Sequence, residues 1–110
     1  MPAPNLAFYK KLRKEFNEVS EYYHDTTDDL DREIHGYGLG DRTSFHITLS
    51  SLKDLDPLVK QLSNRIAIML EANELKEKAK SEFEKMLKDL SSYESDINFL
   101  IRDIEDMLSY

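Results

Sequence analysis

Three glycines stand close together in the segment GYGLGDR, residues 36–42, and clustered glycines are a feature of phosphate-binding loops. Gly36, Gly38 and Gly40 are all the glycines of the chain. A phosphate-binding loop places its glycines between a strand and a helix N-terminus, so that backbone N–H groups face the anion. Here a predicted helix precedes the glycines, no Gly-Lys-Ser/Thr is present, and nearby acidic side chains would repel phosphate. We therefore interpret the segment as the end of a helix followed by a flexible bend in the chain.

A second candidate for chemistry is the pair Glu21 and His24, which has the E-x-x-H spacing of di-iron and di-manganese helical bundles. Such a centre needs a second copy of the motif and two further inward-facing glutamates, and this chain has one copy. Both residues also fall on the solvent side of their predicted helix. The sequence contains no nucleophile motif either. We therefore expect a non-catalytic protein with no cofactor and no metal.

Composition and charge narrow the class of partner. The 110 residues are 40% hydrophobic and 34% charged, and such a high charged fraction is typical of long helices and coiled coils. A net charge of −7 opposes binding to a nucleic-acid backbone. A basic, aromatic turn at residues 8–16 is too short, and too soon followed by glutamates, to predict membrane binding. Nothing resembles a signal peptide or a membrane span, so we expect a cytoplasmic protein, with the nucleus as an alternative.

The elements that would position a site are helical. Residues 5–35 predict a helix, with Asn5 as its N-cap and Gly36 at its end. Apolar or tolerated side chains recur in it at steps of three and four, which keeps them on one face. These are Tyr9, Leu12, Phe16, Val19, Tyr23, Thr26 and Leu30.

The next segment, residues 36–56, predicts a connection that includes an extended piece. Its apolar residues alternate with polar ones around position 47, and we expect them to lie against the helices. Its apolar contacts would be Phe45, Ile47, Leu49, Leu52 and Leu55. Asp56 and Pro57 then have the residue types preferred at an N-cap and at the first helical position. A second helix is therefore predicted to begin at residue 57.

Residues 57–110 predict one long, coiled-coil-like helix. From Ala79 to Met107 the apolar positions alternate at steps of four and three without a slip. The favoured fold is all-α and a single domain, an antiparallel helical hairpin in which residues 5–35 fold back along the first half of this helix. The alternative is a three-helix bundle with a break near residues 91–95, because Ser91 and Glu94 match a capping box.

The favoured hairpin leaves the C-terminal apolar seam uncovered, and an uncovered seam needs a second chain. Acidic residues also gather in residues 89–110, where they oppose the helix dipole, so we expect the native chain to continue or a partner to cap this end. The predicted partner interface is Leu90, Tyr93, Ile97, Phe99, Leu100, Ile101, Ile104, Met107 and Leu108.

These features predict a non-catalytic oligomerisation or scaffold module that acts through helical protein–protein contacts. Its partner would be a second copy, as in a dimer, or another helical subunit, with no nucleic acid, no membrane and no small-molecule substrate. The alternative is a small acidic inhibitor or regulator that binds a basic protein surface by mimicry. The two hypotheses differ in shape, since the first expects an assembled rod and the second a compact monomer.

Overall fold

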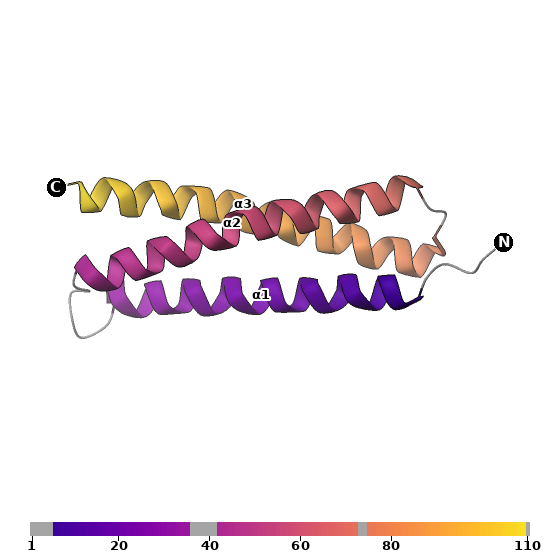
Figure 1. Cartoon of the computed structure of the whole chain (residues 1–110), viewed down its shortest axis with the longest axis horizontal. Helices are drawn as coiled ribbons and strands as arrows, with labels where there is room; N and C mark the ends of the chain where they lie inside the picture. Colours follow the sequence, from indigo (N-terminus) through magenta and orange to yellow (C-terminus); the bar gives the residue numbers. More distant parts are fainter. Residues whose placement is uncertain (1–5, 36–41, 73–74, 110) are drawn as a thin grey trace.

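The computed structural model describes residues 6–35, 42–72 and 75–109, which form three long helices (Figure 1). Helix α1 spans Leu6–His35, α2 spans Arg42–Ala72 and α3 spans Glu77–Leu108. They pack side by side into a rod with extents of 59 × 22 × 18 Å. The helices α1 and α3 run in the same direction and α2 runs against both. The all-α fold class is confirmed, and the three-helix alternative describes the arrangement.

The core lies along the rod axis, where each helix contributes one face. On α1 the predicted apolar face is confirmed, with five members buried and Phe16 and Val19 half-buried. On α3 every second member of the predicted apolar repeat is also buried, namely Phe83, Leu90, Ile97 and Ile104. The fully or almost fully buried residues of α2 and α3 are Leu52, Leu55, Val59, Leu62, Ile66, Met69, Phe83, Leu90, Ile97 and Ile104.

The predicted connection over residues 36–56 is wrong from Arg42 onward, because α2 begins there. The residues around position 47 are helical, and Ile47 is 63% exposed, whereas the other predicted apolar contacts are buried or half-buried: Phe45, Leu49, Leu52 and Leu55. The governing pattern is a face with steps of four and three that passes straight through Pro57: Thr48, Leu52, Leu55, Val59, Leu62, Ile66 and Met69. Burial of this face outweighs the local start signal and the backbone hydrogen bond that a proline inside a helix removes.

The predicted continuous helix over residues 57–110 is also wrong, since α2 ends at Ala72 and α3 begins at Glu77. The capping-box residues Ser91 and Glu94 lie within α3, not at a break. Ending α2 at this point lets α3 fold back along it, so the heptad seam is buried within the same chain. Asn5 and Gly36, the predicted ends of the first helix, lie outside the described residues.

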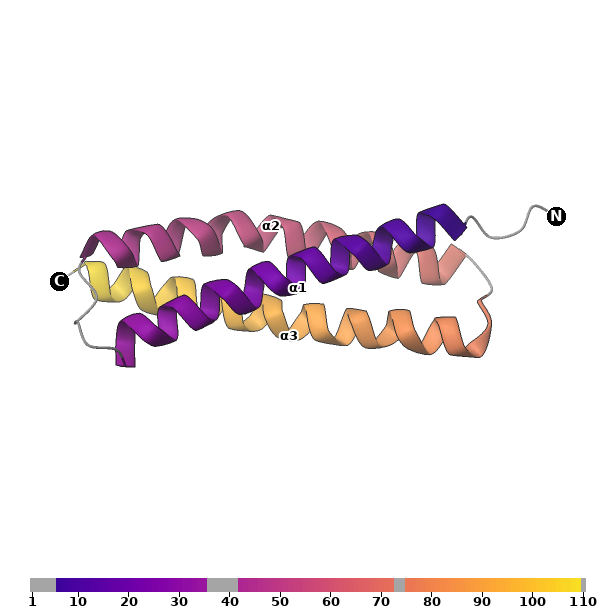
Figure 2. The same cartoon turned by 90° about the horizontal axis from the view of Figure 1, so that it is seen from below.

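Helix α1 lies across the α2–α3 pair (Figure 2) and is fastened to α3 by aromatic and polar contacts. The ring of Tyr9 lies 5.9 Å from that of Phe83, and Arg13 forms an ion pair with Glu82. Further along, the ring of Tyr23 stacks on that of Tyr93 at 4.2 Å. These large side chains link α1 to α3, while the backbone of α1 packs more closely along α2.

Candidate functional site

The predicted C-terminal interface is mostly internal to the bundle. Leu90, Ile97 and Ile104 are buried. Four others are half-buried and pack against the same core: Tyr93, Leu100, Ile101 and Leu108. Only Phe99, 64% exposed, and Met107, 41% exposed, face outward. The chain's own helices cover the seam, so no second chain is needed to hide it.

The residues considered for metal binding are not assembled into a site. His24 is exposed on α1, and its ring packs edge-on against Tyr93, with the ring centres 5.8 Å apart. Across residues 6–35, 42–72 and 75–109 there is no group of three or more histidine, aspartate or glutamate side chains placed to hold a metal ion. The glycine segment, residues 36–41, lies outside the described residues.

A polar cluster between α1 and α3 is fully occupied by contacts within the chain. The hydroxyl of Tyr23 donates a 2.7 Å hydrogen bond to Oδ2 of Asp96, and the hydroxyls of Ser20 and Tyr93 lie 2.9 Å apart. Burial, followed by the hydrogen bond to Asp96, raises the pKa of Tyr23 above its ordinary value. A protonated, hydrogen-bonded tyrosine fixes α1 on α3 and offers no reactive group.

Exposed apolar side chains gather instead along the groove between α1 and α2. Six large apolar side chains are exposed in the part of the chain that the structure describes, and four of them lie in this groove. Phe8 projects from α1, and Ile47, Leu58 and Ile68 project from α2. Single exposed apolar residues are ordinary on a protein surface, whereas these four lie in a row along one groove. We call this surface the α1–α2 groove.

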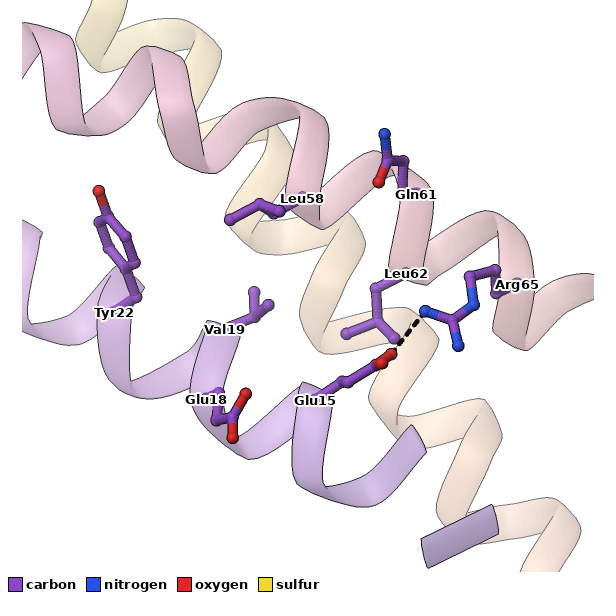
Figure 3. A pocket seen from close by; sticks show the side chains of 8 residues that line it. All are labelled: Glu15, Glu18, Val19, Tyr22, Leu58, Gln61, Leu62 and Arg65. Atoms are coloured by element: carbon purple, nitrogen blue, oxygen red, sulfur yellow. Dashed lines mark hydrogen bonds and ion pairs between the residues drawn. The ribbon is translucent and has the colours of Figure 1, made fainter. Parts of the chain in front are cut away.

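The middle of the α1–α2 groove is a hollow of about 430 Å³ (Figure 3). Val19 from α1 and Leu62 from α2 point into the space between the helices, and Tyr22 and Leu58 lie on either side of it. An ion pair bridges the hollow, with Nη1 of Arg65 2.6 Å from Oε2 of Glu15. The remaining lining residues are Glu18 and Gln61. The floor is therefore apolar and the rim is polar.

The two ends of the α1–α2 groove differ in chemistry. Beyond the ion pair, a hollow of about 290 Å³ is lined by apolar side chains together with Arg65: Phe8, Ile68, Met69 and Ala72. In the opposite direction, a hollow of about 410 Å³ is lined largely by carboxylates: Glu18, Glu21, Asp25 and Asp29. It continues into a hollow of about 320 Å³ beside Ile47 and Arg32. The groove is thus apolar at one end and acidic at the other.

The charges on α1 follow the same division. Lys10, Lys11 and Lys14 are exposed near the apolar end. At the acidic end Asp29 is paired with Arg32, and Glu18 lies 4.0 Å from Nζ of Lys14. No ion pair among the described residues joins Glu21 or Asp25 to a cation. The acidic end of the groove therefore carries carboxylates whose negative charge no ion pair of the described residues neutralises.

Comparison with known protein families, curated proteins and solved structures gave no match for this chain. None of the helices in the described ranges is long and apolar enough to cross a membrane.

Sequence reasoning missed the α1–α2 groove because it considered only the buried row of each helix, and because it placed Ile47 in a connection and not in a helix. On α2 the groove residues stand one position before members of the buried face, so Ile47, Leu58 and Ile68 precede Thr48, Val59 and Met69. This second row of apolar residues, one position before the buried row, was the sequence signal that could have revealed the groove. On α1, Phe8 and Tyr22 likewise stand one position before the buried residues Tyr9 and Tyr23.

Proposed function

We propose that this chain is a non-catalytic assembly module that binds a helix in the α1–α2 groove. Two neighbouring helices with an apolar floor and a polar rim receive a further amphipathic helix by packing its side chains between theirs. The observation that carries the proposal is the row of exposed apolar side chains, Phe8, Leu58 and Ile68 with Ile47, along a single groove.

The dimensions of the groove fit this ligand. Its lining residues run along α1 from Phe8 to Asp29, which at about 1.5 Å per residue is roughly 30 Å. A bound helix of about 20 residues would match that length and complete a four-helix arrangement with α1, α2 and α3. Its apolar side chains would cover Leu58 and Tyr22, the aliphatic and the aromatic anchor beside the central hollow.

A synthetic amphipathic peptide tests this proposal. The probe is a helix of about 20 residues with leucine at heptad a and d positions and lysine and glutamate elsewhere. We expect saturable binding, with NMR shift changes concentrated on the groove residues of α1 and α2. Leu58→Asp should weaken binding roughly tenfold or more, because a charge would enter the centre of the interface.

The matched control is Phe99→Asp, which places the same charge at a more exposed apolar position on α3. It should leave the affinity unchanged. Equal affinity of the peptide for Leu58→Asp and Phe99→Asp, or shift changes centred on Phe99, would contradict a role for the α1–α2 groove.

A further inference from the structure

We infer that the natural occupant of the α1–α2 groove is a second copy of this chain, bound with its α1 antiparallel to the first. This inference rests on the proposed function and adds the identity and the direction of the partner. It follows from the order of charges along the exposed edge of α1, from the positions of those charges about one central residue, and from the area that the face offers.

Beside the groove, the unpaired positive and negative charges of α1 lie in separate halves of the helix, while Glu15 in the first half is paired with Arg65 and Arg32 in the second half is paired with Asp29. Lys11, which lies on the groove side by its helical spacing, precedes Glu18, and the unpaired acids Glu21 and Asp25, which line the acidic hollow, follow it. Two copies packed in parallel would set like charges beside each other. Two antiparallel copies would set the cations of each beside the acids of the other, which favours association and fixes direction.

The register that achieves this match is centred on Glu18. Lys11 and Asp25 each stand seven residues from Glu18, and both lie on the groove side of α1 by their helical spacing. An antiparallel pair centred there brings Lys11 of each copy level with Asp25 of the other. The pairing occurs twice because a two-fold dimer repeats every contact. Glu18 then lies near the two-fold axis opposite Glu18 of the other copy, and in each copy Lys14, 4.0 Å away, offsets part of that negative charge.

The apolar content and size of the face are sufficient for a dimer. Facing copies would cover Tyr22 and Leu58 near the middle and Phe8 and Ile68 toward the ends. With α1 about 45 Å long and the rod 22 Å wide, the face offers on the order of 1,000 Å². Stable interfaces bury about 800 Å² on each partner. The surface is therefore large enough to hold a second copy without further contacts.

Reciprocal charge reversal tests the inference in the full chain. Light scattering of the parent should show a mass that rises with concentration from 12.9 kDa toward twice that value. Lys11→Glu and Asp25→Lys should each weaken self-association roughly tenfold or more, since each places like charges together twice. An equimolar mixture of the two variants should regain the dimer, because both contacts between positions 11 and 25 in the mixed pair would then join an acid to a lysine. The matched controls are Lys88→Glu and Asp103→Lys, the same changes at exposed positions on α3.

Three results would overturn the inference. One is a parent mass of 12.9 kDa at every concentration. Another is a mixture of Lys11→Glu and Asp25→Lys that associates no better than either variant alone. The third is an equal effect of the α3 controls. If the parent stays monomeric while the leucine peptide still binds at Leu58, the second copy is ruled out as occupant and the proposed function stands. If the peptide also fails to bind, both are rejected.

Discussion

The three-helix arrangement predicts very different stability effects for mutations at two nearby positions on α3, one buried and one exposed. Ile97 has no exposed surface and Phe99 is 64% exposed, although both were expected to contact a partner. Truncating a fully buried isoleucine to alanine removes packed methyl groups and leaves a cavity, which costs about 2–5 kcal/mol. We therefore expect Ile97→Ala to lower the free energy of unfolding by about 3 kcal/mol, against a total of roughly 5–15 kcal/mol.

Phe99→Ala is the matched comparison, and it should change the free energy of unfolding by less than about 0.5 kcal/mol. Urea unfolding followed by far-UV circular dichroism measures both variants at one fixed protein concentration, since association would itself stabilise the folded state. With a slope of roughly 1.5–2 kcal/mol/M, Ile97→Ala should lower the urea midpoint by about 1.5–2 M. The burial of the C-terminal seam would be refuted if Phe99→Ala cost as much as Ile97→Ala, or if neither changed the midpoint.

Two further predictions concern α2 and the contact between α1 and α3. Pro57→Ala should raise the free energy of unfolding by about 1–3 kcal/mol, because it restores an amide donor inside α2, and an unchanged or lower urea midpoint would contradict this. Tyr23 has a folded-state pKa raised above its ordinary 10.0, so its contribution to stability is complete below pH 10 and is lost as pH rises further. The stability difference between the parent and Tyr23→Phe should therefore shrink as the pH is raised from about 9 to about 11, and a constant difference would argue against the Tyr23–Asp96 hydrogen bond.

The faces of α1 and α3 could be predicted from sequence because each helix has one clean apolar repeat. Tyr9, Leu12 and Leu30 on α1, and Phe83, Leu90 and Ile104 on α3, are buried as their spacing indicates. Such a repeat depends only on helical geometry, so it remains valid whichever helix covers it.

The beginning and the end of α2 could not be predicted from sequence, because the local start and stop signals disagree with the tertiary packing. Asp56 and Pro57 have the residue types that begin a helix, yet the packing of Leu52 and Leu55 extends α2 well before them. The end of α2 at Ala72 comes without a glycine or proline. When the apolar repeat of residues 79–107 is extended backwards, Arg65 and Lys76 fall on it, and these charged residues were the signal against one continuous helix; Arg65 instead pairs with Glu15.

Sequence reasoning placed residues 5–35 beside the helix that begins at residue 57, but it did not identify the exposed apolar row that lies between them. Phe8 and Tyr22 on α1, and Leu58 and Ile68 on α2, are apolar or aromatic residues outside the buried rows, and singly each is only weak evidence of a binding surface. Together they line adjoining hollows. Neighbouring helices in a bundle are set by loop length and by the burial of each face, and the sequence prediction had placed residues 42–56 outside any helix.

The most direct test of the assembly account uses the absence of cysteine from the chain, which makes a single introduced thiol an unambiguous probe. Glu18→Cys places a thiol near the proposed two-fold axis, where two copies would bring their α carbons within the roughly 4–7 Å that a disulfide needs. Under mild oxidation at low concentration we predict rapid formation of a covalent dimer by Glu18→Cys and little by Phe99→Cys. Equal cross-linking of the two variants, or faster cross-linking at position 99, would contradict association through the α1–α2 groove.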